Sequence, residues 1–257
     1  MPNNTVDRRS SILEMLNDNG KIHVDELSKA FKVSDVTVRN DLKQLEKDGF
    51  LKRTHGGALR MDKVAFDLNL LEKEKKHAAE KCKIGLAAAR SVREGETIFL
   101  DSGTTTMEIA RNLKNMQNIT VITNAVNIAN ELSRSPGVEV LLTGGILREN
   151  SFSLVGPHAE QMLREFFGDR LFLGVDGISV QYGVTTPNHL EARVNRVMVE
   201  HANEVVVVTD SSKFSRRSLS LIVPIDKIHK VITDSRISEQ DKADLLANAI
   251  EVELVQV

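Results

Sequence analysis

Hydroxyl side chains surround a glycine in the run Asp101-Ser102-Gly103-Thr104-Thr105-Thr106, which begins where the apolar run TIFL ends. Gly103 permits a tight turn, and the hydroxyls and free backbone amides at the start of a following helix can hold an anion. A phosphate group fits such a turn. The plainer alternative is an ordinary helix N-cap, which explains one Ser or Thr but not four hydroxyls. We therefore predict an anion-binding turn at residues 101–106.

Three further loops also follow apolar runs: Thr143-Gly144-Gly145, Gly174-Val175-Asp176-Gly177 and Asp210-Ser211-Ser212-Lys213. Asp101 and Asp176 can bind sugar hydroxyls, and Lys213 can pair with a phosphate or a carboxylate. Glu191, in the segment TTPNHLE, is a further candidate. Each residue also has a simpler explanation, since glycine pairs mark tight turns, an aspartate can cap a helix and a lysine can face solvent. The predicted ligand-binding set beyond residues 101–106 is Gly144, Gly145, Asp176, Gly177, Glu191 and Lys213.

The elements that must position these loops are short apolar runs alternating with helical patterns from Glu96 onward. The runs are TIFLD, ITVITN, VEVLLTGG, RLFLGVDG, EVVVVTD and KVITD. Such alternation predicts an α/β fold with a largely parallel sheet. The loops then share one edge of the sheet, where the strands have their carboxyl ends and ligands bind in such folds.

A second group of candidate residues lies in the stretch VSDVTVRNDLKQLE near the N-terminus. Val38, Leu42 and Leu45 recur at helical spacing and predict one buried face, with Ser34 as N-cap and Gly49 as C-terminal stop. The opposite face and its flanks are polar apart from one valine, and they carry Val36, Thr37, Arg39, Asn40, Lys43, Gln44 and Lys47. A charged helix face usually contacts only solvent, so the elements before and after this helix decide the interpretation.

Two helical patterns precede this helix, and a hairpin pattern around Gly56-Gly57 follows it. Three helices and a hairpin predict a winged helix-turn-helix, whose last helix enters the DNA major groove. Thr37, Arg39 and Asn40 then reach base edges, and Val36 suits a thymine methyl. Phosphate contacts are predicted for Arg8, Arg9, Lys43, Arg53 and His55, and Ser34 completes the predicted DNA-binding set.

Composition limits the class of protein. The 257 residues, 41% of them hydrophobic, suffice for one large domain or two unequal ones. The single cysteine, Cys82, excludes an intrachain disulfide. We see no signal-peptide pattern and no membrane-spanning run, and we expect a cytoplasmic protein. The net charge is −2, but residues 1–60 carry eleven basic against nine acidic side chains. The basic excess is therefore small and local.

After Arg60 the helix-turn-helix pattern gives way to a highly charged stretch, and this change predicts the domain organisation. We expect a DNA-binding domain at residues 1–60, a charged linker at 61–76 running into a long helix, and a ligand-binding and oligomerisation domain at 77–257. The histidines are scattered, and the sequence contains no metal-ligand spacing and no nucleophile-base pair. We therefore predict no metal and no cofactor.

The N-terminal pattern RR..IL..L...G...V.EL...F.VS..TVRNDL..LE..GFL.R.HGGA resembles the helix-turn-helix of the DeoR-type regulators of bacterial sugar metabolism. The blocks SGTTT, TGG, GVDG and DSSK resemble, in order, the effector domain of the same family. The resemblance extends from about Arg8 to the C-terminus. Asn40 stands where members often carry a second arginine, which affects the operator sequence rather than the fold.

This resemblance implies an effector domain with a fold like that of ribose-5-phosphate isomerase, which binds a phosphorylated sugar. It implies a repressor, acting as a homo-oligomer (dimer or tetramer), that leaves operator DNA when the sugar phosphate binds. The run EARVNRVM resembles the amino-sugar branch of the family and implies a hexosamine 6-phosphate.

Two other functions use the same features. One is a sugar-phosphate isomerase on the same scaffold, with Asp101, Asp176 or Lys213 as acid or base. A helix-turn-helix has no use in an isomerase, so we expect a regulator and not an enzyme. The other is an adaptor that binds a protein through a sheet edge, and no feature of the sequence favours it.

Overall fold

The computed structural model describes residues 8–9, 11–13, 15–16, 20–47, 51–59 and 69–257. Its contacts divide the chain into a smaller unit, Met1–Phe66, and a larger unit, Asp67–Val257.

The smaller unit is the predicted winged helix-turn-helix. Residues 8–9, 11–13 and 15–16 are helical, and they are followed by β1 (Lys21–His23), α2 (Val24–Phe31), α3 (Asp35–Lys47), β2 (Lys52–Thr54) and β3 (Gly57–Leu59). The described strands form an antiparallel sheet in the order β1-β3-β2. Strand β1 was not predicted. The expected helix stop at Gly49 lies outside the described residues.

Apolar side chains from every helix of this unit meet in one core. Ile12, Leu27, Val38 and Leu42 are all buried there, so the stripe predicted for α3 does face the interior. Gly57 has a packing reason of its own, because a Cβ at this position would lie 1.9 Å from the carbonyl oxygen of Ile22. Only glycine lets β3 approach β1 this closely.

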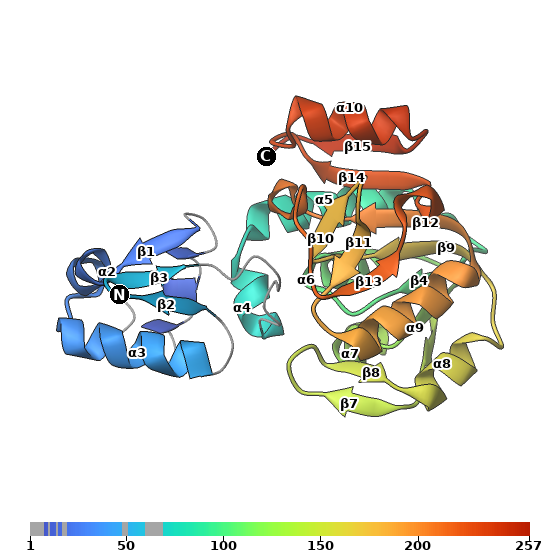
Figure 1. Ribbon diagram of the computed structural model, residues 1–257. Helices are drawn as coiled ribbons and strands as arrows, with labels where there is room; N and C mark the ends of the chain where they lie inside the picture. The colour runs from blue at the N-terminus through green and yellow to red at the C-terminus, as the bar shows by residue number, and fades with distance from the viewer. Residues whose placement is uncertain (1–7, 10, 14, 17–19, 48–50, 60–68) are drawn as a thin grey trace. The chain divides into compact units, whose positions relative to one another are not determined.

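The larger unit is built on a parallel sheet, as predicted (Figure 1). Within residues 69–257, seven strands lie in the order β15-β14-β12-β9-β4-β5-β6. Their bounds are β4 Thr97–Leu100, β5 Ile119–Thr123, β6 Val138–Leu142, β9 Gly168–Leu173, β12 Ala202–Val208, β14 Lys230–Asp234 and β15 Glu251–Val255. All six predicted runs are strands of this sheet, and β15 adds an edge strand that was not predicted.

Helices cover both faces of the sheet (Figure 1). The helices of this unit are α4 (Leu70–Lys75), α5 (Ala78–Arg90), α6 (Thr104–Leu113), α7 (Val126–Leu132), α8 (Pro157–Leu163), α9 (His189–Glu200), α10 (Glu239–Ala247) and the 3-10 turns η1 (Ser211–Lys213) and η2 (Ile225–Lys227). Leu100 packs in a core with residues of α5, α6 and α7. Its neighbour Phe99 points to the other core, with residues of α8, α9 and α10. Alternate side chains of β4 are thus buried on opposite faces, which explains its continuous apolar run.

Two smaller sheets complete this unit, and neither was predicted. A hairpin is formed by β7 (Ile146–Arg148) and β8 (Ser153–Val155), and an antiparallel sheet has the order β10-β11-β13. The strands of that sheet are β10 (Gly177–Ser179), β11 (Gly183–Thr186) and β13 (Ser220–Val223).

The stretch predicted as a linker, residues 61–76, contains α4. Asn69 caps this helix by accepting a hydrogen bond from Leu71 N at 3.0 Å, and Leu70 is buried. The second half of the stretch is therefore folded as part of the larger unit, while the domain boundaries stay a prediction. None of the helices in the described residues has the length and apolarity needed to cross a membrane.

Candidate functional site

The outer face of α3 carries the residues predicted to read DNA. Arg39, Asn40 and Lys43 are exposed, and Val36 is 67% exposed although it is apolar. An apolar side chain held this far in solvent, between polar neighbours, suits contact with a thymine methyl group.

Ser34 and Thr37 fix the start of α3. Ser34 Oγ accepts a hydrogen bond from Thr37 N at 3.3 Å and lies 2.9 Å from Thr37 Oγ1. The predicted N-cap is therefore confirmed. Both side chains sit at the end of the helix that meets the groove in helix-turn-helix proteins.

Two arginines of the first helical segment hold α3 in place. Arg8 Nε lies 2.7 Å from Asp41, and Arg9 Nε lies 2.8 Å from the same carboxylate. Arg8 and Asp41 are buried, so the structure gives Arg8 a role inside the domain. Arg9 keeps a third of its side chain exposed, and its contact with a phosphate stays a prediction.

The β2–β3 hairpin carries the remaining predicted phosphate contacts. His55 is exposed at its turn, and Arg53 is half-buried. Arg53 N donates to Glu46 Oε1 at 2.8 Å, which ties the hairpin to α3.

In the larger unit, Asp101 occupies the point where the chain order of the sheet reverses. Strands β4, β5 and β6 run outward on one side, and β9 and β12 lie on the other. Asp101 directly follows β4, and its Oδ1 accepts a hydrogen bond at 3.1 Å from the N–H of Gly174, which directly follows β9. Ligands of parallel α/β sheets bind at such a switch point.

Burial favours the neutral form of the Asp101 carboxyl. Burial raises the pKa of its carboxyl to about 8, although the hydrogen bond from Gly174 opposes the rise. The negative charges of Glu191 and Asp176 add to it, so the three predicted carboxylates lie close enough to interact. A neutral Asp101 can donate a hydrogen bond to a ligand as well as accept one.

The predicted anion turn forms the start of α6. Gly103 is its N-cap, in an extended conformation and without a side-chain cap. Thr106 Oγ1 donates within the turn, to the carbonyl oxygens of Asp101 at 2.9 Å and Gly103 at 3.1 Å. Thr106 therefore shapes the turn, while Ser102 and Thr104 are half-buried and Thr105 is buried. The first-turn amides of α6 are positioned to meet an anion.

Strands β5 and β6 bring further polar groups to the same edge. Thr143 Oγ1 and Asn124 Oδ1 are buried and have no hydrogen-bond partner among the described residues. Buried polar atoms of this kind are expected to meet water or a ligand. Gly144 and Gly145 follow Thr143 and are exposed, and a Cβ on Gly144 would meet only open space.

Asp176 joins two lysines from distant parts of the chain. Lys73 Nζ lies 2.9 Å from both of its carboxylate oxygens, and Lys213 Nζ lies 3.5 Å away. Burial opposes ionisation, but the two ammonium groups outweigh it and hold the pKa of the Asp176 carboxyl below its ordinary value. The predicted pairing of Lys213 with a carboxylate is thus internal to the site.

Gly177 and Glu191 have structural partners. A Cβ on Gly177 would lie 2.6 Å from the carbonyl oxygen of Arg216, so packing alone requires a glycine there. Glu191, in the first turn of α9, pairs with Arg148 and accepts a hydrogen bond from Ser153 Oγ at 2.9 Å. Ligand contacts by both stay predictions.

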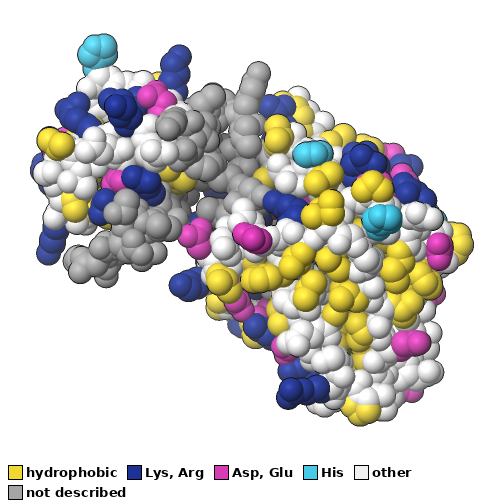
Figure 2. Space-filling view, turned by 90° about the horizontal axis from the view of Figure 1, so that it is seen from below, with side chains coloured by type: hydrophobic (Ala, Val, Ile, Leu, Met, Phe, Trp, Pro, Cys, Tyr) yellow, Lys and Arg dark blue, Asp and Glu magenta, His cyan; other side chains and the backbone are white. Residues whose placement is uncertain are grey.

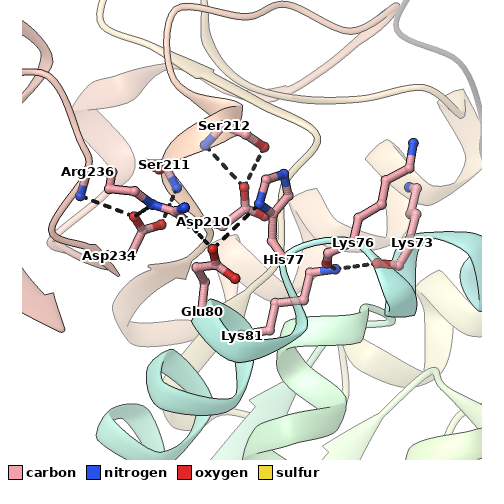
Figure 3. Close-up of polar contacts among 10 residues, drawn as sticks. All are labelled: Lys73, Lys76, His77, Glu80, Lys81, Asp210, Ser211, Ser212, Asp234 and Arg236. Carbon is pink, nitrogen blue, oxygen red and sulfur yellow. Dashed lines mark hydrogen bonds and ion pairs between the residues drawn. The ribbon is translucent and has the colours of Figure 1, made fainter. Parts of the chain in front are cut away.

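Lys81 of α5 lies close to Lys73 and Lys76 at the end of α4 (Figure 3). Its ammonium donates to the carbonyl oxygens of Lys73 and Lys76, at the end of α4. Burial lowers its pKa to about 8, against the opposing charge of Asp210, and the charges of Lys213 and Lys73 lower it further. Asp210 caps η1 by accepting from Ser212 N at 3.1 Å.

Sequence reasoning missed four residues of this site: Lys73, Lys81, Asn124 and Arg148. Asn124 follows a predicted strand directly, so the rule used for the other strand ends applies to it. The two lysines lie in a highly charged stretch without a long apolar stripe, and Arg148 lies in a hairpin that was not predicted. For these three residues the sequence contains no clear signal.

Comparison with known proteins identifies the family. Residues 76–235 match the model of the DeoR C terminal sensor domain, and residues 8–64 match the DeoR-like helix-turn-helix domain. An Escherichia coli O157:H7 protein provisionally named an aga operon transcriptional repressor is 42% identical, over 98% of this chain and 94% of that protein. The transcriptional repressor AccR of Agrobacterium fabrum is 38% identical, over 91% of each chain.

Among solved structures, ribose 5-phosphate isomerase A of Methanocaldococcus jannaschii aligns over 52% of this chain and 53% of its own. The TM-score is 0.39 and the identity 19%, and a similarity this remote says nothing about chemistry. The family models and the relatives decide the matter: the chain belongs to the DeoR family of helix-turn-helix transcriptional regulators.

Proposed function

We propose that this regulator represses an operon for sugar catabolism and that a phosphorylated sugar releases it from operator DNA. Double-stranded DNA binds α3 and the β2–β3 hairpin. The sugar phosphate binds at the strand ends of the larger unit, and a hexosamine 6-phosphate is the proposed member of its class. The protein acts in the cytoplasm.

The observation that carries this proposal is the polar group at the switch point of the sheet. A neutral Asp101 and an ionised Asp176 can share the hydroxyl groups of a sugar. The start of α6 supplies amides for a phosphate, and Lys213 supplies positive charge nearby. Each part of a phosphorylated sugar thus has a chemically matched partner along one sheet edge.

The chain is a regulator rather than an enzyme, since its relatives are named as transcriptional repressors and its N-terminal part is a helix-turn-helix. An isomerase activity of the larger unit can still be tested directly. Aldose–ketose interconversion should be absent on every sugar phosphate tried. Turnover that is lost in Asp176→Asn would establish the enzyme instead.

Release requires that the ligand binds the DNA-free conformation more tightly than the DNA-bound one. We expect a coupling free energy of about 1 to 3 kcal/mol, the usual range between two sites. Because the smaller unit has only a small basic excess, one copy makes few phosphate contacts. Useful specific affinity therefore needs a homo-oligomer on repeated half-sites.

Exposed apolar side chains support the homo-oligomer. Figure 2 shows apolar side chains gathered on one face of the larger unit. Ile146 and Leu147 of β7 are 65% and 51% exposed, so this hairpin presents apolar side chains on both of its faces. Exposed apolar surface of this kind commonly marks a contact between proteins.

The test is a titration of DNA from upstream of the gene, followed by fluorescence anisotropy at fixed salt. It is run without ligand and with glucose 6-phosphate, glucosamine 6-phosphate and their N-acetylated relatives. One phosphate should weaken a specific complex by about five- to 150-fold, as the coupling range requires. Specific binding that no phosphate changes would refute the ligand part of the proposal.

A further inference from the structure

Helix α4 is the first described element after the winged helix-turn-helix, and its contacts reach the parts of the candidate ligand site. Leu70 N donates to the carbonyl oxygen of Asn150, in the turn of the β7–β8 hairpin, at 2.7 Å. Glu74 lies 2.9 Å from Arg111 of α6. Lys73 binds Asp176 between β9 and β10. The helix therefore touches three segments that carry or border the predicted ligand residues.

Helix α4 depends on contacts with the rest of the larger unit, and these three are among them. A helix of six residues has almost no stability of its own, because nucleation outweighs the few hydrogen bonds it forms. Glu74 and Arg111 have 46% and 40% of their side chains exposed, and an ion pair so exposed contributes little. Lys73 and Asp176 are 21% and 15% exposed. Of these two ion pairs, the Lys73–Asp176 pair is therefore the stronger tie.

The same pair blocks the carboxylate that we propose for sugar hydroxyls. Lys73 Nζ lies 2.9 Å from both oxygens of Asp176, so the ammonium occupies the position in front of the carboxylate from which two neighbouring hydroxyls would bond both oxygens together. Lys213 Nζ makes a longer contact, 3.5 Å from Oδ1 alone, and can remain. Asp176 thus keeps one positive partner when Lys73 leaves, and no unpaired buried charge results.

Neighbouring charges also favour the departure of Lys73. Lys73, Lys81 and Lys213 lie close enough for their charges to repel one another, since the charges of the other two help to lower the pKa of Lys81. Figure 3 shows the Lys81 ammonium directed at the end of α4, where it bonds main-chain oxygens rather than a carboxylate. When Lys73 moves away, α4 loses the Lys73–Asp176 pair, which is the more buried of the two ion pairs described above. The repulsion among the three lysines then falls.

We propose that a phosphorylated sugar displaces Lys73 from Asp176, and that the loosening of α4 carries the signal toward the DNA-binding unit. This inference rests on the proposed function, and it assigns to Lys73 the role of a coupling residue. The ligand class is a phosphate ester with at least two neighbouring hydroxyl groups. Along the chain, α4 lies between the β2–β3 hairpin of the DNA-binding unit and α5 of the larger unit. A change in α4 can therefore be passed toward the DNA-binding unit.

The experiment measures α4 itself by hydrogen–deuterium exchange of the peptide covering residues 69–77, in the full chain. In the native protein, glucosamine 6-phosphate and the other sugar phosphates of the panel are compared with inorganic phosphate. The sugar phosphate that releases DNA should speed exchange of this peptide about tenfold, whereas inorganic phosphate, which has no hydroxyl pair to offer, should not. Slower exchange on sugar-phosphate binding would overturn the inference.

Lys73→Met removes the ammonium and keeps an unbranched side chain, and Lys75→Met is the matched control on the exposed side of the same helix. Without any ligand, Lys73→Met should already exchange about tenfold faster in α4 and bind operator DNA about fivefold more weakly. Lys75→Met should resemble the native protein. This ligand-free comparison tests the role of the Lys73–Asp176 pair even if no sugar phosphate binds.

The two proposals fail differently. If no sugar phosphate binds by calorimetry, the proposed ligand class is wrong. If one binds and releases DNA equally well from the native protein and Lys73→Met, with equal exchange in α4, the ligand site stands and the role of Lys73 is refuted.

Discussion

Replacing Asp101 by asparagine should make the protein's stability less dependent on pH. The ordinary pKa of an aspartate is 3.8, and burial raises that of Asp101 to about 8 in the folded state. Between these values the folded protein holds a proton that the unfolded chain has released. The free energy of unfolding therefore falls as pH rises from about 4 to about 8. An asparagine is neutral throughout and keeps the acceptor for Gly174 N.

The magnitude follows from proton linkage. One proton held only by the folded state changes the free energy of unfolding by about 1.4 kcal/mol per pH unit. Between pH 5 and pH 7 the native protein should lose roughly 2 to 3 kcal/mol more than Asp101→Asn. Above about pH 8, where Asp101 is ionised in both states, the difference should level off.

The assay is urea unfolding of both proteins at a series of pH values, followed by far-ultraviolet circular dichroism, at fixed protein concentration. The other titrating groups are common to both proteins and cancel in the difference. Asp226→Asn is the control, because Asp226 is 69% exposed and should leave the pH dependence as it is. Parallel curves for the native protein and Asp101→Asn would show that Asp101 is ionised throughout and refute the reasoning.

Further predictions concern the two binding sites and the smaller core. Arg39→Ala should weaken operator binding by about 1 to 3 kcal/mol and relax specificity at one base pair, whereas Lys43→Ala should weaken all DNA alike. Binding to a set of single-base operator variants checks this, and an equal loss on every sequence would make Arg39 a phosphate contact. Thr105→Val should leave operator affinity intact and reduce release by sugar phosphate in the anisotropy titration; unchanged release would place the anion elsewhere. Leu42→Ala should destabilise the smaller unit by about 2 to 5 kcal/mol, because Leu42 is buried in its core. Urea unfolding measures this loss, and a change below about 1 kcal/mol would mean that the site collapses around the missing atoms.

The sequence alone was enough for the elements with strong periodicity. Helix α3 has its three apolar residues at helical spacing, and the structure buries them as expected. The six apolar runs of the larger unit became strands for a related reason, since a parallel strand is buried on both faces and is apolar throughout. The polar residues that end these runs reach one edge of the sheet because parallel strands end together.

Shorter or less regular elements could not be predicted. Strand β15 alternates polar and apolar residues at the sheet edge, and β1, β7 and β10 have only three residues each. Such segments are strands because they pair with a partner, and three or four residues are too few to show a strand pattern of their own. The two small sheets of the larger unit were missed for this reason, since their strands have only three or four residues each.

The sequence by itself determined the two kinds of domain, the buried and exposed faces of α3 and the strand-end loops, because these depend on local spacing. Only the tertiary structure decided which charges meet. Lys73 and Asp176 stand 103 positions apart in the chain, and Arg148 reaches Glu191 from a separate hairpin. Burial then raises the pKa of Asp101, and the charge of Glu191 on α9, which no spacing rule identifies as a neighbour, adds to the rise. Periodicity reports which face of an element is buried, but the partner of that face is a property of the folded chain.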